Sequence, residues 1–204
     1  MPSVRIATYN VHKCRGLDRR VRPDRIAEVL REIKADIVAL QEVISADTAS
    51  REHNQARYLA EELDLSYCLG ENRRLSGGAY GNALLSRFPV RMARNYDITW
   101  RGREQRGCLR ADIDLGLAEP LHVFNVHLGT AFIERRYQGQ QLISGEILRN
   151  SDLSGQRIVL GDFNEWTRGL ASRLLASELQ SVDVRQHIGR ARTYPWLLPL
   201  LHLD

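Results

Sequence analysis

One stretch decides the fold of this chain: Arg157-Ile158-Val159-Leu160-Gly161-Asp162-Phe163-Asn164-Glu165. Its apolar, β-branched run ends at a glycine and is followed by an acid and an amide, which is typical of a buried strand with polar groups at its end. Because strand side chains alternate between faces, Asp162 and Asn164 would point the same way if the extended conformation persists through Phe163. An acid that orients water and an amide that donates to a phosphoryl oxygen suit phosphate ester hydrolysis. The same letters are also typical of an ordinary turn, so the stretch alone leaves both interpretations open.

The composition is that of a chain with a sizeable core. With 204 residues, 43% of them hydrophobic and 26% charged, we expect a single domain, residues 1–204. Cys14, Cys68 and Cys108 are odd in number and far apart, which indicates reduced thiols rather than a disulfide framework or a zinc site. No apolar run reaches the ~18 residues of a membrane span, and no signal-like apolar segment follows Met1. We therefore expect a soluble, cytoplasmic protein without a membrane span.

Arginine supplies nearly all of the positive charge. The net charge is +4, and the 29 basic residues include only two lysines, Lys13 and Lys34. The planar guanidinium matches phosphate oxygens, although a GC-rich genome would produce the same bias. With 25 acidic residues the surface is mixed, so a nucleic-acid partner is permitted but not indicated.

Apolar spacing along the chain predicts an alternation of strands and helices. Helices are expected where apolar residues recur on one face, at residues 23–33, 56–63, 133–148 and 170–175. Strands are expected at residues 4–9, 36–40, 67–69, 82–86, 90–98, 108–113, 121–127 and 201–204, in addition to the opening stretch.

The connections between these elements indicate how the strands pair. Residues 73–81 are predicted to be a Gly-rich loop, and residues 193–199 an aromatic and proline-rich connector. Strands 90–98 and 108–113 are joined by a charged loop, residues 100–107, without a helix, so they should pair antiparallel. We predict two mixed sheets packed face to face with helices outside, a layered α/β sandwich.

Polar residues recur at four of the predicted strand ends. Asn10, Glu42, Asn125 with His127, and the Asp162 motif each follow an apolar run. Together they would line one rim, where open sheets usually place their sites. Glu42 with a few waters would be a hard oxygen site for Mg²⁺ or Mn²⁺, although a solvated acid after a strand is the alternative.

Five short motifs give the chain a family resemblance. In their order and over nearly the whole length, it resembles the endonuclease/exonuclease/phosphatase superfamily, which includes DNase I and the abasic-site endonucleases. The motifs are Thr8-Tyr9-Asn10-Val11-His12, Leu40-Gln41-Glu42-Val43, Gly81-Asn82-Ala83-Leu84-Leu85-Ser86, Asn125-Val126-His127-Leu128 and Gly161-Asp162-Phe163-Asn164. The resemblance implies a DNase I-like, four-layer α/β sandwich of two mixed β-sheets flanked by helices.

The resemblance also implies a metal-dependent, in-line attack of water on a phosphodiester or phosphomonoester. Glu42 would hold the metal, Mg²⁺ or alternatively Mn²⁺, and Asn10 would lie beside it. Asp162 would orient or deprotonate the attacking water. Asn164 and His127 would donate to the phosphoryl oxygens as negative charge develops.

Weaker candidates lie outside these roles. Asn82 and Arg106 are candidates for substrate contact, with surface charge as the alternative for Arg106. The remaining histidines, His12, His53, His122 and His187, are expected to be structural or exposed.

The family pattern ends in a closing Asp-His pair, and this sequence stops at Asp204. By resemblance, Asp204 is the acid that orients the closing histidine, and we include it among the catalytic residues. The pair itself is absent from the sequence, so we expect the domain to lack its last strands, either as part of a longer protein or as a naturally short product. The alternative function is a catalytically impaired member that binds phosphate ligands as a scaffold.

Substrate choice remains open at this point. Nucleic acid, a phospholipid headgroup and a small phosphodiester all fit, although no lysine-rich loop or interleaved aromatic run favours nucleic acid. Residues 73–81 and 100–107 are the expected specificity elements because they are polar and contain arginine. The sequence leaves the diester or monoester preference and the oligomeric state open.

Overall fold

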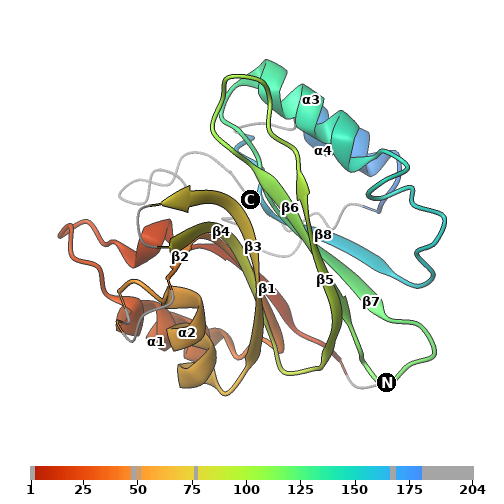
Figure 1. Cartoon of the computed structure of the whole chain (residues 1–204). Coiled ribbons are helices and arrows are strands. Elements are labelled where there is room, and N and C mark those ends of the chain that lie inside the picture. The colour runs from red at the N-terminus through yellow and green to blue at the C-terminus, as the bar shows by residue number, and fades with distance from the viewer. Residues whose placement is uncertain (1–2, 47–49, 51, 76–77, 166–168, 181–204) are drawn as a thin grey trace, which may run out of the picture.

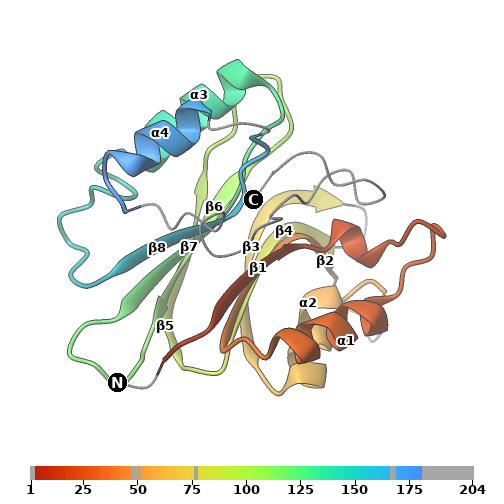
Figure 2. The ribbon, with the colours of Figure 1, turned by 180° about the vertical axis from the view of Figure 1, so that it is seen from behind.

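Two β-sheets pack face to face between two pairs of helices, in a computed structural model of the chain (Figure 1 and, from behind, Figure 2). The structure describes residues 3–46, 50, 52–75, 78–165 and 169–180. This is the predicted layered α/β sandwich. Within the described residues, no helix is long and apolar enough to cross a membrane.

The strands form two sheets of four within the described residues. One sheet has the order β1-β2-β4-β3 and the other β5-β6-β7-β8. In each sheet one pair is parallel, β1 with β2 and β7 with β8, and the other neighbours are antiparallel. The strands are β1 (Ile6–Asn10), β2 (Ile37–Ser45), β3 (Ser66–Leu75), β4 (Gly78–Ser86), β5 (Val90–Asp97), β6 (Gly107–Ile113), β7 (Leu121–His127) and β8 (Arg157–Asp162).

The helices cover the outer faces of the two sheets, as Figures 1 and 2 show. They are the 3-10 turn η1 (His12–Cys14) and the helices α1 (Pro23–Ile33), α2 (Gln55–Leu63), α3 (Phe132–Leu142) and α4 (Leu170–Ala176). Proline begins α1 because its missing N–H is not needed there. Glu165 accepts hydrogen bonds from the backbone N–H groups of Ala171 and Ser172 and so caps the first turn of α4.

Three apolar clusters correspond to the three interfaces between the four layers. Leu40, Leu59 and Leu85 belong to the cluster that packs α1 and α2 on the first sheet. A middle cluster that includes Ile37 and Leu109 joins the two sheets. The third cluster packs α3 and α4 on the second sheet. Burial on both faces explains why these strands read as continuous apolar runs.

The prediction that residues 73–81 form a loop is wrong. Arg73 and Arg74 belong to β3, and Gly78 to Gly81 belong to β4. These residues therefore lie in two paired antiparallel strands rather than in a loop. Gly81 allows β3 and β4 to approach closely, because a Cβ atom on Gly81 would lie 2.0 Å from the carbonyl oxygen of Gly70.

Two predicted boundaries are also corrected. The strand expected to end at Glu42 continues to Ser45, across a register shift between Leu40 and Val43. The helix predicted to reach Leu148 ends at Leu142, and the following residues form turns. The antiparallel pairing of β5 with β6 is confirmed. The expected connector at 193–199, the strand at 201–204, His187 and Asp204 lie outside the described residues.

Candidate active site

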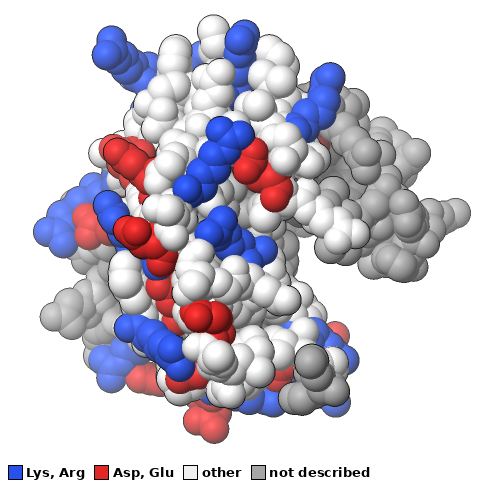
Figure 3. Space-filling model, turned by 90° about the vertical axis from the view of Figure 1, so that its right-hand side faces the viewer, with Lys and Arg blue, Asp and Glu red and all other residues white. Residues whose placement is uncertain are grey.

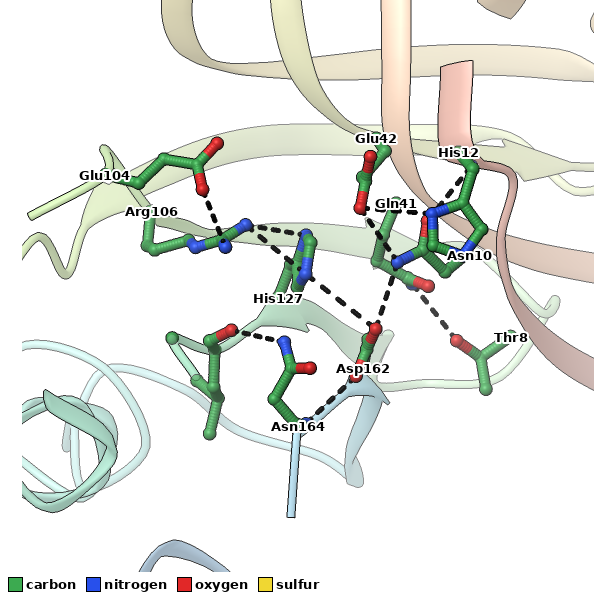
Figure 4. A network of polar contacts seen from close by, with 12 residues as sticks. Thr8, Asn10, His12, Gln41, Glu42, Glu104, Arg106, His127, Asp162 and Asn164 are labelled. Carbon is green, nitrogen blue, oxygen red and sulfur yellow. Dashed lines mark hydrogen bonds and ion pairs between the residues drawn. The ribbon is translucent and has the colours of Figure 1, made fainter. Parts of the chain in front are cut away.

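Four strands present polar side chains at one rim of the sandwich (Figure 4). Asn10 closes β1, Glu42 lies in β2, His127 closes β7 and Asp162 closes β8. The two parallel pairs, one in each sheet, run towards this same rim. The structure therefore brings together four residues that the sequence singles out, from segments up to 152 positions apart.

Asn10 connects the two sheets at the site. Its amide nitrogen Nδ2 donates to Glu42 Oε1 at 3.2 Å and to Asp162 Oδ2 at 3.0 Å. Its amide oxygen accepts from the backbone N–H of His12 at 3.1 Å, which sets the orientation of the amide group. One carboxylate from each sheet thus converges on a single side chain.

Glu42 owes its position to an irregularity in β2. Its φ angle is 57°, and the register of β2 against β4 shifts at this point. A bulge of this kind re-aims a side chain that would otherwise follow the strand alternation. Burial opposes ionisation of Glu42, but the hydrogen bond from His12, 3.4 Å away, and that from Asn10 outweigh it and lower its pKa to about 2. Glu42 is therefore a carboxylate at neutral pH, with Lys13 Nζ 3.8 Å away.

Asp162 and Asn164 form a turn at the end of β8. The strand ends at Asp162, and Asn164 has a φ angle of 50°, so Asn164 itself is not in an extended conformation. The backbone N–H of Asn164 donates to Asp162 Oδ1 at 2.9 Å, and its side chain donates to the Leu128 carbonyl at 2.8 Å. The turn interpretation is confirmed, and the turn places both side chains beside His127, which the site interpretation also requires (Figure 4).

His127 is held between Arg106 and Asp162. Arg106 Nη1 lies 2.9 Å from His127 Nδ1 and 3.3 Å from Nε2. Because a guanidinium only donates, the nearer Nδ1 accepts and the ring proton resides on Nε2, which lies 3.8 Å from Asp162 Oδ2. Burial and the charge of Arg106 lower the pKa of His127 to about 4. The ring is therefore a neutral N–H donor at neutral pH.

The two substrate-contact candidates have different surroundings. Arg106 is buried beside His127 and pairs with Glu104 at 2.9 Å, so it lies within the site. Asn82 is fully buried and donates to the carbonyl oxygens of Gly107 and Asn125. This position joins the two sheets, and it gives no support to the predicted substrate contact of Asn82.

Sequence reasoning placed Asn125 on the rim, but Asn125 is fully buried beneath the site, and its partners Gln41 and Thr8 were not assigned any role. Gln41 Nε2 donates to Asn125 Oδ1 at 2.7 Å and to Thr8 Oγ1 at 3.0 Å; Gln41 and Asn125 are buried, and Thr8 is half-buried. A signal was available, because Thr8 lies two positions before Asn10 on β1 and so shares its face. His12, expected to be structural or exposed, is exposed but contacts Glu42.

The donor set at the site fits a hard divalent cation with few protein ligands. Among the described residues, no group of three or more His, Cys, Asp or Glu side chains is arranged to hold a metal. Glu42 nevertheless offers an ionised, 16% exposed carboxylate beside the amide of Asn10. Mg²⁺ commonly takes one or two carboxylates and retains several waters, so the Glu42 carboxylate is compatible with it, whereas Asn10 presents its donor nitrogen here.

Comparison with known proteins agrees with this architecture. The family model described as "Endonuclease/Exonuclease/phosphatase family" matches residues 7–200. The uncharacterized protein YbhP of Escherichia coli K12 is 32% identical over 212 residues, covering 99% of this chain and 83% of YbhP.

Solved structures share the fold. An endonuclease/exonuclease/phosphatase from Beutenbergia cavernae superposes with a TM-score of 0.70 at 23% identity, covering 90% of this chain and 55% of that protein. A mannosyl-6-phosphatase of Bacteroides thetaiotaomicron gives a TM-score of 0.66 at 20% identity, covering 86% of this chain and 70% of that protein. This chain thus spans about half the length of the Beutenbergia protein. It belongs to the endonuclease/exonuclease/phosphatase family, a commonly metal-dependent family whose fold indicates a phosphoesterase hydrolase.

Proposed function

We propose that this chain is a Mg²⁺-dependent hydrolase of phosphate esters, in which water attacks the phosphorus in line with the leaving group. The observation that carries the proposal is the meeting of Glu42 and Asp162, one carboxylate from each sheet, at the amide of Asn10. Here a neutral histidine donor also lies 3.8 Å from Asp162, an arrangement suited to water activation and charge stabilisation.

Glu42 would hold the cation, and Asn10 would lie beside it and orient the carboxylate, because the amide nitrogen that faces Glu42 donates a hydrogen bond. Mg²⁺, or alternatively Mn²⁺, would neutralise charge on the phosphoryl group or on the leaving alkoxide when bound. Glu42 suits this role because its pKa of about 2 keeps it ionised at neutral pH. The hydrogen bond between the His12 backbone N–H and the Asn10 oxygen keeps the amide oriented towards both carboxylates.

Asp162 would orient the attacking water and accept its proton. Its two oxygens already accept from the Asn164 backbone and from Asn10, which fixes the carboxylate plane. A base held in a fixed orientation reduces the entropic cost of aligning the attacking water.

His127, Asn164 and Arg106 would stabilise the negative charge that develops on the phosphoryl oxygens. The neutral His127 ring presents its Nε2 proton towards the Asp162 side of the site. Asn164 uses one amide proton on the Leu128 carbonyl and keeps the other for a ligand. Arg106 holds the His127 tautomer and adds a permanent positive charge.

The proposal is tested by hydrolysis of bis-p-nitrophenyl phosphate by the purified chain, with Mg²⁺ or with EDTA. We expect turnover with Mg²⁺, its loss with EDTA, and a decrease of about 100-fold or more in Asp162→Ala. Asp152→Ala is the matched control, because Asp152 is an exposed carboxylate before β8.

Either of two outcomes contradicts the proposal. Turnover that persists in both EDTA and Asp162→Ala would assign the activity to other groups. A folded wild-type chain that binds phosphate but shows no turnover would instead support the scaffold function.

A further inference from the structure

The start of helix α3 exposes apolar side chains, whereas polar side chains are buried on its inner face. Its two large apolar residues at the start, Phe132 and Ile133, are 61% and 57% exposed. On its inner face, Glu134 and Gln138 are buried, at 4% and 0% exposure. Exposing large apolar side chains while burying polar ones is unfavourable in water, so the exposed pair calls for an apolar partner.

The buried polar residues explain why α3 is oriented in this way. Gln138 Oε1 accepts from the backbone N–H of Gly129 at 2.8 Å, and Gln138 also contacts Glu134. These bonds hold the segment that leaves His127, only five positions before Phe132. The inner face of α3 thus binds the segment that follows His127, and the outer face exposes Phe132 and Ile133 to solvent.

The loop between β5 and β6 extends this outer face. Trp100 packs against Tyr137 of α3 with ring centroids 4.8 Å apart, and Tyr137 lies one helical turn after Ile133. Figures 1 and 2 both show this loop rising beside the start of α3. We call Trp100, Phe132 and Ile133 the apolar rim.

Three arginines lie next to the residues of the apolar rim along the chain. Arg101, Arg103 and Arg136 are exposed, and none of them forms an ion pair within the described part of the chain. The acidic residues of the β5–β6 loop and of α3 do not neutralise these arginines, because Glu104 pairs with Arg106 and Glu134 is buried. In Figure 3, Lys and Arg side chains stand around the upper end of the molecule, the end that α3 occupies in Figure 1.

We propose that the apolar rim and its three arginines form a docking surface for an anionic phospholipid bilayer. Phe132 and Ile133 would enter the acyl boundary, Trp100 would lie at headgroup depth, and the arginines would pair with lipid phosphates. The aliphatic Ile133 favours lipid over single-stranded nucleic acid, because it offers no ring for a base to stack on. This surface is independent of the proposed hydrolase activity, although it would place the site beside the bilayer.

Co-sedimentation with vesicles tests the proposal without requiring catalysis. We expect the chain to bind phosphatidylcholine vesicles that contain phosphatidylglycerol, and to bind pure phosphatidylcholine much more weakly. Phe132→Ser/Ile133→Ser should weaken binding by about 100-fold, roughly tenfold for each apolar side chain. Arg101→Ala/Arg103→Ala should weaken it by at least about tenfold.

Leu117→Ser is the matched control. Leu117 is 61% exposed, like Phe132, but lies in the loop before β7, at the opposite end of that strand from His127. The Leu117→Ser variant should bind vesicles as tightly as the wild type does. Ile133→Ser alone serves as a second variant if circular dichroism shows that the double variant is unfolded.

Several results would overturn the docking surface. They are wild-type protein that stays in the supernatant with every vesicle, a folded Phe132→Ser/Ile133→Ser variant that binds as tightly as the wild type, and rim-dependent binding of single-stranded DNA without vesicle binding. Parallel assays with bis-p-nitrophenyl phosphate separate the two proposals, because turnover without vesicle binding contradicts only this one.

Discussion

Gln41 of the first sheet donates from Nε2 to Asn125 Oδ1 of the second sheet at 2.7 Å. Asn125 in turn donates to the carbonyl oxygens of Leu40 and Ala83, each at 2.9 Å. Both side chains are almost completely buried between the sheets. This pair therefore fixes how the two sheets meet near Asn10 and Glu42 of the first sheet and His127 of the second.

Asn125→Ala should destabilise the protein and misalign the site. The substitution leaves the carbonyls of Leu40 and Ala83 and the amide of Gln41 without these partners, which should cost about 2 to 4 kcal/mol. Urea unfolding measures the change. Gln140→Ala, on the exposed side of α3, should stay within about 0.5 kcal/mol of the wild type, and an equal loss in both variants would contradict this role.

Arg106→Ala should reduce kcat on bis-p-nitrophenyl phosphate by about 100-fold, because it removes a buried positive charge and the donor that fixes the His127 tautomer. Arg106→Lys should recover only part of the rate, since an ammonium lacks the planar fork that contacts both His127 and Glu104. Arg91→Ala, which removes a surface pair with Asp114, is the control. Full activity in Arg106→Ala would exclude Arg106 from the chemistry.

Protonation of Asp112 should lower the free energy of unfolding at acidic pH. It accepts from Arg110 and from His122, whose Nδ1 lies 2.6 Å from Asp112 Oδ1, in a buried cluster behind β6 and β7. Burial opposes ionisation, but these two partners outweigh it and hold the Asp112 pKa below its usual value.

A lowered folded-state pKa sets the sign of this effect. The stabilisation is fully present above the unfolded pKa of about 3.9 and is lost as the pH falls through the folded pKa. Asp112→Asn should cost about 3 kcal/mol at pH 7, and its difference from wild type should narrow below about pH 4. Denaturant unfolding between acid and neutral pH measures this, and a pH-independent difference would contradict it. Asp152→Asn, at an exposed carboxylate, is the control.

Gly81→Ala should disrupt the β3–β4 hairpin, because its Cβ atom would lie 2.0 Å from the Gly70 carbonyl oxygen and 2.9 Å from the Asn72 nitrogen. These contacts are with backbone, so relief requires strand movement at a cost of roughly 1 to 3 kcal/mol. Gly145→Ala meets no atom within 4 Å and should be neutral. Thermal unfolding of both variants compares them directly, and equal midpoints would show that the strands adjust freely.

Local pattern was sufficient for most of the elements and for the main polar groups. The apolar spacing and Pro23 predicted α1, and the β-branched run before Asp162 predicted β8. The polar ends of β1, β7 and β8 and the acid in β2 indicated one rim, because strands that run parallel deliver their ends to the same side. These features depend on neighbouring residues, so the sequence carries them directly.

Tertiary structure decided the features that depend on contacts between distant segments. The Gln41–Asn125 bond joins residues 84 positions apart, and Arg106 reaches His127 from the loop before β6. Gly81 appeared to mark a loop, although its role is the close approach of Gly70.

The amino-acid sequence by itself determined the layered fold, the family and the residue types at the rim, because periodicity and strand-end chemistry are local. Only the folded chain decided which side chains pair across the sheets and which face of α3 meets solvent. Packing against the second sheet and Gly129 turns Gln138 inward and Phe132 outward, against the preference of each residue for its surroundings.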